Sequence, residues 1–160
     1  MSSTILITGG TLIDGTGVTP VHNDGILLAN GAIVALGDQA MKQASPEATV
    51  IDATNKTVMP GLIDSHLHCT FDDVQSNDQL FFHRDPTLVA LVAAQNLQKV
   101  LRSGVTSFVD PDTLHGVGPS LRDALDAGVI EGPRMKTGVQ ALLTAAGGTA
   151  GPLIPDEGTV

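Results

Sequence analysis

The sequence predicts an α/β protein in two parts, a small β-module over residues 1–57 and a unit of alternating strands and helices over residues 58–160. Two observations predict this division. The first part consists of short apolar runs separated by turn residues, which is typical of a small β-sandwich or β-roll. In the second part, short apolar runs alternate with segments of helical spacing. That alternation favours right-handed βαβ units and a parallel sheet.

The β-module contains a hairpin signal. Asn30 and Gly31 separate two apolar runs, and both residue types adopt the positive φ angles that a two-residue type I′ turn requires. The expected strands of the module are residues 5–7, 26–29, 32–36, 50–52 and 56–58.

The second part has clear element boundaries. Asp85 and Pro86 predict the N-cap and first position of a helix, which we expect to end at Gly104. Residues 69–84 are expected to form a long loop. The remaining expected elements are strands at 58–68, 105–110 and about 135–141, and a second helix between Pro119 and Gly128.

Charge and composition exclude several classes of partner. The formal net charge is −9, which argues against nucleic acid and anionic membrane surfaces. One cysteine, Cys69, excludes an internal disulfide framework, and we expect it to be buried as a packing residue. No apolar run approaches the roughly 20 residues of a membrane span, and the N-terminus lacks a basic leader region. A cytoplasmic protein without nucleic-acid or membrane partners is therefore expected.

Two histidines are the main candidates for chemistry. Residues 58–68 read Val-Met-Pro-Gly-Leu-Ile-Asp-Ser-His-Leu-His, a short apolar strand that ends in His66 and His68. Because side chains alternate along a strand, both imidazoles and Asp64 should share a face. Two neutral imidazoles there could bind zinc, iron, nickel or copper. The alternative is a pair of hydrogen-bonded histidines at a sheet edge, since His-x-His is a short pattern.

Three other residues have two readings each. Asp64 is either a buried polar residue or a group that orients a metal-bound imidazole. His83 and His115 are either surface histidines or substrate contacts, because both lie in loops after predicted strands. The loop that carries His83 could form part of a lid.

Four stretches carry a family resemblance. Residues 9–15, Gly-Gly-Thr-Leu-Ile-Asp-Gly, and residues 59–68 together resemble the amidohydrolase superfamily of metal-dependent hydrolases. Residues 101–107, Leu-Arg-Ser-Gly-Val-Thr-Ser, and 121–135, Leu-Arg-Asp-Ala-Leu-Asp-Ala-Gly-Val-Ile-Glu-Gly-Pro-Arg-Met, are similar to its imidazolonepropionase-like and Xaa-Pro dipeptidase-like branch. The resemblance covers nearly the whole chain.

The resemblance implies a particular fold and site. Residues 58–160 would form the first three strands of a (β/α)₈ TIM-like barrel, preceded by part of a β-sandwich built from both chain ends. Two metal ions, expected to be zinc, would lie at the barrel mouth, with His66 and His68 on the more buried one. A bridging carboxylated lysine, two further histidines and the general-base aspartate would lie beyond Val160. No catalytic base is therefore expected in this segment.

The function implied is hydrolysis of an amide-type C–N bond by a metal-bridged hydroxide, in a small-molecule or N-acyl amino acid-like substrate. We expect this chain to be an N-terminal segment that is inactive alone and needs the remainder of its own chain after Val160. Assembly into a homo-oligomer is a further possibility. An Xaa-Pro dipeptidase or carboxypeptidase and a non-catalytic scaffold are the alternatives. Two departures weaken the transfer of dipeptidase specificity. Val109-Asp110 stands where the branch has Arg-Asp, and Gly147-Gly148-Thr149 where it has Gly-Gly-His.

Overall fold

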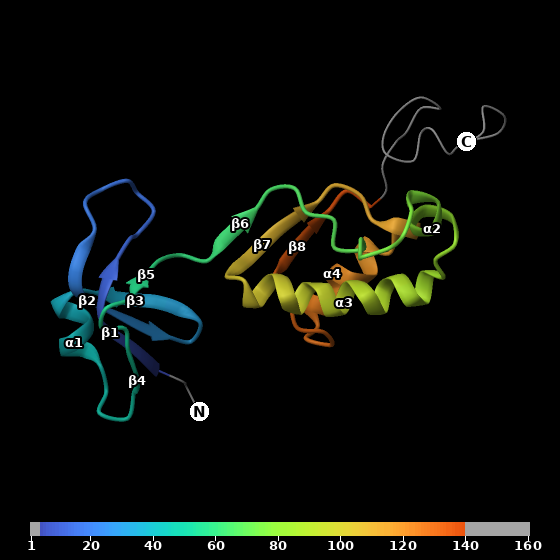
Figure 1. The fold of residues 1–160 in the computed structure, drawn as a ribbon. Helices are drawn as coiled ribbons and strands as arrows, with labels where there is room; N and C mark the ends of the chain where they lie inside the picture. Colours follow the sequence, from blue (N-terminus) through green and yellow to red (C-terminus); the bar gives the residue numbers. More distant parts are fainter. Residues whose placement is uncertain (1–3, 140–160) are drawn as a thin grey trace. The chain divides into compact units, whose positions relative to one another are not determined.

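The computed structural model describes residues 4–139 (Figure 1). The chain divides into two compact units, residues 1–60 and 61–160. Each unit has its own sheet and its own apolar core.

The N-terminal unit is a five-stranded mixed sheet. Its order is β3-β2-β1-β4, and β5 also pairs with β1. Strand β1 is antiparallel to β2 and parallel to β4 and β5. The strands are β1 (Thr4–Leu12), β2 (Val21–Ala29), β3 (Ala32–Leu36), β4 (Thr49–Asp52) and β5 (Thr57–Val58). The predicted hairpin is confirmed, with φ of 53° at Asn30 and 76° at Gly31.

A short helix, α1 (Asp38–Gln43), covers one face of this sheet. Ala40 of α1 packs against Leu6 and Leu27, and all three are buried. The sequence analysis missed α1, because fewer than two turns give no readable helical period. Next to β1 and β2 lies an apolar hollow of about 360 Å³, with Ile7, Ile26 and Leu28 in its wall. The second sheet of the predicted sandwich stays a prediction.

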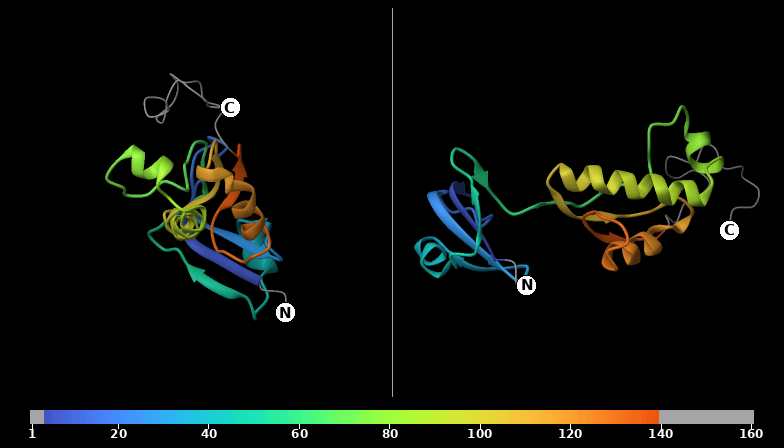
Figure 2. Two further views of the ribbon diagram at one scale, coloured as in Figure 1. Left: turned by 90° about the vertical axis from the view of Figure 1, so that its right-hand side faces the viewer. Right: turned by 90° about the horizontal axis from the view of Figure 1, so that it is seen from below.

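The C-terminal unit contains the expected parallel sheet. Strands β6 (Leu62–Asp64), β7 (Val105–Asp110) and β8 (Arg134–Thr137) are hydrogen-bonded in chain order and all parallel. Helices α3 (Pro86–Arg102) and α4 (Gly118–Asp126) follow β6 and β7, and α3 runs alongside β7 (Figures 1 and 2). The mixed α/β class is confirmed. Closure of the sheet into an eight-stranded barrel stays a prediction.

One apolar core joins the helices to the sheet. Leu97 of α3 and Leu121 of α4 pack with Phe108 of β7 and Met135 of β8, and all four are buried. Since Phe108 and Met135 point toward the helices, alternation directs Ser107 and Lys136 to the other face of the sheet. In a barrel, that other face is the interior.

The predicted boundaries of α3 are confirmed. The Asp85 carboxylate accepts hydrogen bonds from the backbone N–H groups of Thr87 (2.8 Å) and Leu88 (3.3 Å). These bonds hold the pKa of Asp85 below its usual range. Pro86 occupies the first helical position, and Gly104 follows the helix with φ of 95°.

The expectation of an uninterrupted loop over residues 69–84 is wrong. Residues 69–84 contain a further helix, α2 (Asn77–Phe82), rather than only a loop. The hydroxyl of Ser76 caps it by accepting from the backbone N–H of Gln79 (3.2 Å). Leu80 is buried against Val89 and Leu114, so tertiary packing stabilises a helix too short to be read from sequence.

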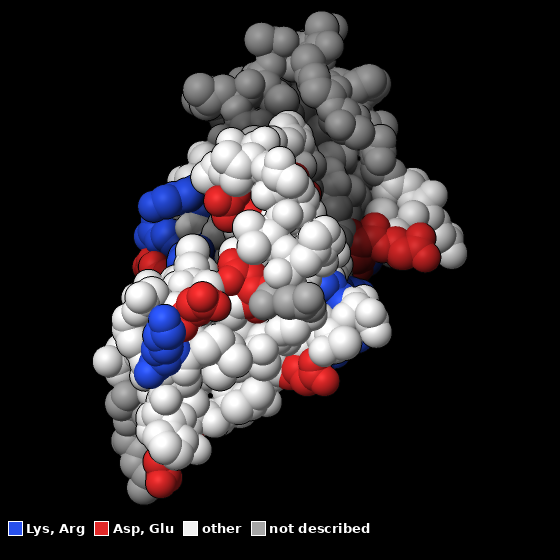
Figure 3. Space-filling model, turned by 90° about the vertical axis from the view of Figure 1, so that its left-hand side faces the viewer, with Lys and Arg blue, Asp and Glu red and all other residues white. Residues whose placement is uncertain are grey.

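The helices within residues 4–139 include none that could span a membrane. No described helix is both long and apolar enough to cross a bilayer. On the face drawn in Figure 3, acidic and basic side chains are scattered among uncharged residues.

Candidate metal centre

The segment after β6 brings two imidazole nitrogens together. Nε2 of His66 lies 3.2 Å from Nε2 of His68, and the ring centroids are 5.0 Å apart. The prediction that both histidines lie on the strand is wrong, because β6 ends at Asp64. The Asp64 carboxylate accepts a hydrogen bond from the backbone N–H of His66 (3.0 Å), which turns the chain. Pairing with β7 resumes where Leu67 N–H donates to the Val109 carbonyl (3.0 Å).

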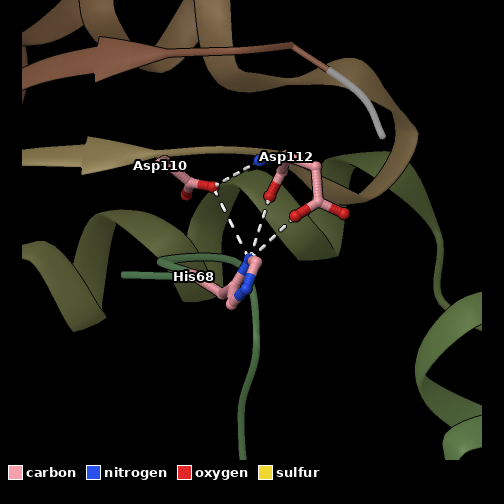
Figure 4. Close-up of side chains that lie close together, drawn as sticks. All are labelled: His68, Asp110 and Asp112. Carbon is pink, nitrogen blue, oxygen red and sulfur yellow. Dashed lines mark hydrogen bonds and ion pairs between the residues drawn. The ribbon is translucent and has the colours of Figure 1, made fainter. Parts of the chain in front are cut away.

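The second nitrogen of His68 lies among oxygens from the end of β7 (Figure 4). Its Nδ1 is 3.0 Å from the Asp112 carboxylate, 3.3 Å from the Asp112 carbonyl and 3.8 Å from the Asp110 carboxylate. These groups are acceptors, so in the neutral ring the proton belongs on Nδ1. The lone pair is then on Nε2, which faces His66.

An aromatic ring supports His68 from its face. Phe71 stacks on the imidazole with ring centroids 4.6 Å apart and planes inclined by 10°. Phe81 of α2 meets Phe71 edge-on at 5.8 Å and 88°. The imidazole is thus held by carboxylate at one edge and by an aromatic stack on one face.

A buried carboxylate joins the two segments of the centre. Asp110 is fully buried, and it accepts hydrogen bonds from the backbone N–H groups of Cys69 (2.9 Å) and Asp112 (3.2 Å). Burial raises the pKa of Asp110, and its hydrogen bonds and the nearby His68 offset that rise only in part. Asp110 therefore ties the residue after His68 to the residue that contacts His68.

Cys69 is the buried packing residue that the sequence predicted, with 1% of its surface exposed. Burial, together with Asp110 beside it, raises the pKa of its thiol well above the usual range. A protonated thiol is a poor metal ligand, so Cys69 contributes to the core.

The distance between the two Nε2 atoms fits a shared metal ion. Zinc–nitrogen bonds of about 2.05 Å at a tetrahedral angle place the two nitrogens about 3.3 Å apart. The observed separation in His66–His68 is 3.2 Å. A second possible donor set is His68, Asp110 and Asp112, whose ligand atoms lie within 4.8 Å of one another. The oxygens of Asp110 already accept two backbone N–H groups, so the Nε2 pair fits a metal better.

The other predicted site residues, Asp64, His83 and His115, lie apart from the paired imidazole nitrogens. The hydrogen bond that Asp64 accepts comes from the backbone of His66, so Asp64 shapes the turn. His83 is exposed at the C-terminal cap of α2. His115 is exposed in a 3₁₀ turn (Leu114–Gly116), with φ of 55°, near enough to help lower the pKa of Asp85. Substrate contact by His83 or His115 stays a prediction.

Sequence reasoning did not connect Asp110 and Asp112 with His68. A usable signal existed, because the carboxyl ends of neighbouring parallel strands meet at one edge of a sheet. Asp110 ends β7, the direct neighbour of β6. The Gly147-Gly148-Thr149 stretch lies outside the described residues.

Comparison with known proteins shows the family. The family model of the Amidohydrolase family matches residues 57–145. Enamidase from Eubacterium barkeri is 31% identical over 119 residues, covering 74% of this chain and 28% of that protein. Imidazolonepropionase from Halobacterium salinarum is 42% identical over 62 residues, covering 36% of this chain and 15% of that protein. A solved structure of an Xaa-Pro dipeptidase with bound methionine in the active site has a TM-score of 0.78 and 28% identity, covering 91% of this chain and 35% of that one.

The chain therefore belongs to the amidohydrolase family, which comprises metal-dependent hydrolases that act on carbon–nitrogen bonds. It spans less than a third of the length of the two curated relatives. The metal dependence of the family agrees with the possible metal donors in this chain, which are the Nε2 pair of His66 and His68 and the neighbouring set of His68, Asp110 and Asp112.

Proposed function

We propose that this chain is the N-terminal part of a binuclear-metal amidohydrolase that hydrolyses an amide-type C–N bond in a small-molecule or N-acyl amino acid-like substrate. One observation carries the proposal: the Nε2 atoms of His66 and His68 lie 3.2 Å apart while the Nδ1 of His68 is held by Asp112. That arrangement directs the lone pair of His68 Nε2 toward His66, whose Nε2 would turn its own lone pair to the same point once its proton is on Nδ1.

His66 and His68 would hold the metal through Nε2, and Asp112 would hold the proton on the Nδ1 of His68. A bound zinc ion supplies a water of lowered pKa and polarises the scissile carbonyl. Two imidazoles fall short of the three or four protein ligands of a zinc site. The lysine, the two histidines and the general-base aspartate are proposed to come from residues after Val160, in a barrel that the three parallel strands begin.

The test removes both imidazoles from the full-length enzyme. The double variant His66→Ala, His68→Ala should lose bound metal and C–N hydrolysis together, as measured by elemental analysis and ammonia or amine release. Retention of stoichiometric metal would refute the assignment. His22→Ala is the matched control, because His22 lies in the N-terminal unit and contacts Thr11 (2.9 Å). That variant should keep its metal.

The proposal also covers the state of the chain. Intact-mass measurement of the natural product should give a polypeptide longer than these 160 residues, or a co-purifying second fragment. A lone 160-residue protein with turnover would contradict it. Cytoplasmic location and self-association belong to the same proposal, and cell fractionation and light scattering test them.

A second candidate activity is that of an Xaa-Pro dipeptidase or carboxypeptidase. The structural likeness to an Xaa-Pro dipeptidase supports it, with a TM-score of 0.78. Val109 stands where that branch has arginine, which weighs against it. Rates on N-acyl amino acids compared with Xaa-Pro dipeptides separate the two activities. A metal-loaded protein without turnover on either series would indicate a non-catalytic scaffold.

A further inference from the structure

His68 is held by two residues that lie outside the His-x-His motif. We propose that Asp112 and Phe71 are positioning residues, which set the tautomer and the ring plane of His68 so that its Nε2 faces His66. The inference rests on the proposed metal-dependent hydrolase and assigns a role to residues of this chain that differ from the ligands themselves.

Asp112 is the closer of the two carboxylates. Its Oδ1 is 3.0 Å from the Nδ1 of His68 and its carbonyl 3.3 Å, whereas the nearest oxygen of Asp110 is 3.8 Å away. Asp110 is already committed to two backbone N–H groups, one of which belongs to Asp112. Asp112 thus has both the shorter contact and a fixed backbone. A carboxylate on one ring nitrogen is the arrangement that orients a metal-binding imidazole.

The segment that carries Asp112 is anchored on both sides. The backbone N–H of Leu114 donates to the hydroxyl of Thr70 (3.2 Å). Thr113 donates to the carbonyl of Val139 through its backbone N–H (3.0 Å) and through its hydroxyl (2.7 Å). Thr70 and Thr113 are both buried. The backbone that carries Asp112 is therefore fixed before any metal binds, and this limits where its carboxylate can lie.

Phe71 restricts a different motion of His68. The two rings are nearly parallel, at 10°, so any tilt of the imidazole must displace the phenyl ring. Phe71 cannot yield freely, because Phe81 of α2 lies edge-on against it at 5.8 Å. Phe71 and Phe81 also pack against the buried cluster that contains Leu80 and Val89. Helix α2 therefore acts on the imidazole through Phe71.

The experiment measures Zn²⁺ affinity of the full-length enzyme by chelator competition. Asp112→Ala should weaken binding about 10- to 100-fold, as loss of such a partner does. Asp112→Asn keeps an oxygen acceptor and should recover most of that loss. Phe71→Leu should weaken binding about 2- to 10-fold. Asp73→Ala and Phe82→Leu are the matched controls, since both residues are exposed, and neither should change affinity.

A second readout separates positioning from mere stability. Histidine ¹⁵N NMR of the metal-free enzyme, above the pH range of imidazole titration, should show His68 protonated on Nδ1 in the wild type. Asp112→Ala should show mixed tautomers, and Asp112→Leu, which also lacks a side-chain acceptor, carries the test if the alanine variant does not fold. Unchanged affinity and an unchanged tautomer in the Asp112 variants that lack a side-chain acceptor would overturn the inference. If the double histidine variant kept its metal, the proposed function would fail instead, and the tautomer would still report on Asp112.

Discussion

Asp110→Ala should destabilise the candidate metal centre, and the hydrogen bonds of its carboxylate set the size of the loss in free energy. Its carboxylate accepts from the backbone N–H of Cys69 (2.9 Å) and of Asp112 (3.2 Å). Cys69 is 1% exposed, so no water replaces the lost acceptor, and an unsatisfied buried N–H costs about 1–3 kcal/mol. The side chain of Asp112 is 28% exposed, so water can reach its segment and the second bond costs less. Part of this free-energy cost is offset, because the variant no longer buries the charge of Asp110.

The assay is hydrogen exchange of the Cys69 amide, read by mass spectrometry on peptides that cover residues 66–72 of the full-length enzyme. A loss of about 1–3 kcal/mol in local opening free energy accelerates exchange about 5- to 150-fold. Asp123→Ala is the control, because Asp123 is 68% exposed and pairs with Arg122 on the surface of α4. Equal exchange in Asp110→Ala and in the control would refute the reasoning.

Three further predictions concern the stability of the fold. Asp85→Ala should destabilise the start of α3. Because the folded pKa of Asp85 is depressed, the stabilisation by its carboxylate is present above pH 3.8 and disappears as pH falls through the folded pKa. Urea unfolding at several pH values should show the difference in unfolding free energy between variant and wild type shrinking in acid, and a constant difference would contradict this. Leu97→Ala, at a fully buried position, should lower the free energy of unfolding by about 2–5 kcal/mol. Leu91→Ala, at a position 66% exposed, should change it by no more than about 0.5 kcal/mol. Equal urea-unfolding midpoints for the two variants would contradict this prediction. Gly61→Ala places a methyl group against the side chain of Thr106 and should cost about 1–3 kcal/mol, part of which Thr106→Ala restores.

Local chemistry made several elements readable. Asn30 and Gly31 take the positive φ angles that their side chains permit, and the hairpin forms where expected. Asp85 and Pro86 begin α3 because a cap acceptor and a fixed φ act within one turn. Strand β7 has the predicted bounds, Val105–Asp110, since a β-rich apolar run lies between two helices. Each of these signals lies within a few residues of its effect.

The missed helices show where local signals end. α1 and α2 have six residues each, too few to display a helical period. α2 exists because Leu80 is buried against Val89 and Leu114, which come from other segments. A contact between residues distant in sequence leaves no local pattern.

For the candidate metal centre too, some features were readable from the sequence and others depended on the tertiary structure. The sequence by itself determined that His66 and His68 are one residue apart at the end of an apolar run, and it carried the family resemblance that the comparisons confirmed. Only the tertiary structure decided how the pair is held. Hydrogen bonding by Asp64 ends the strand early, yet the two Nε2 atoms still meet at 3.2 Å. Asp112 reaches His68 because parallel pairing of β6 and β7 brings residues 44 apart into contact, and pairing across a sheet depends on the fold rather than on spacing along the chain.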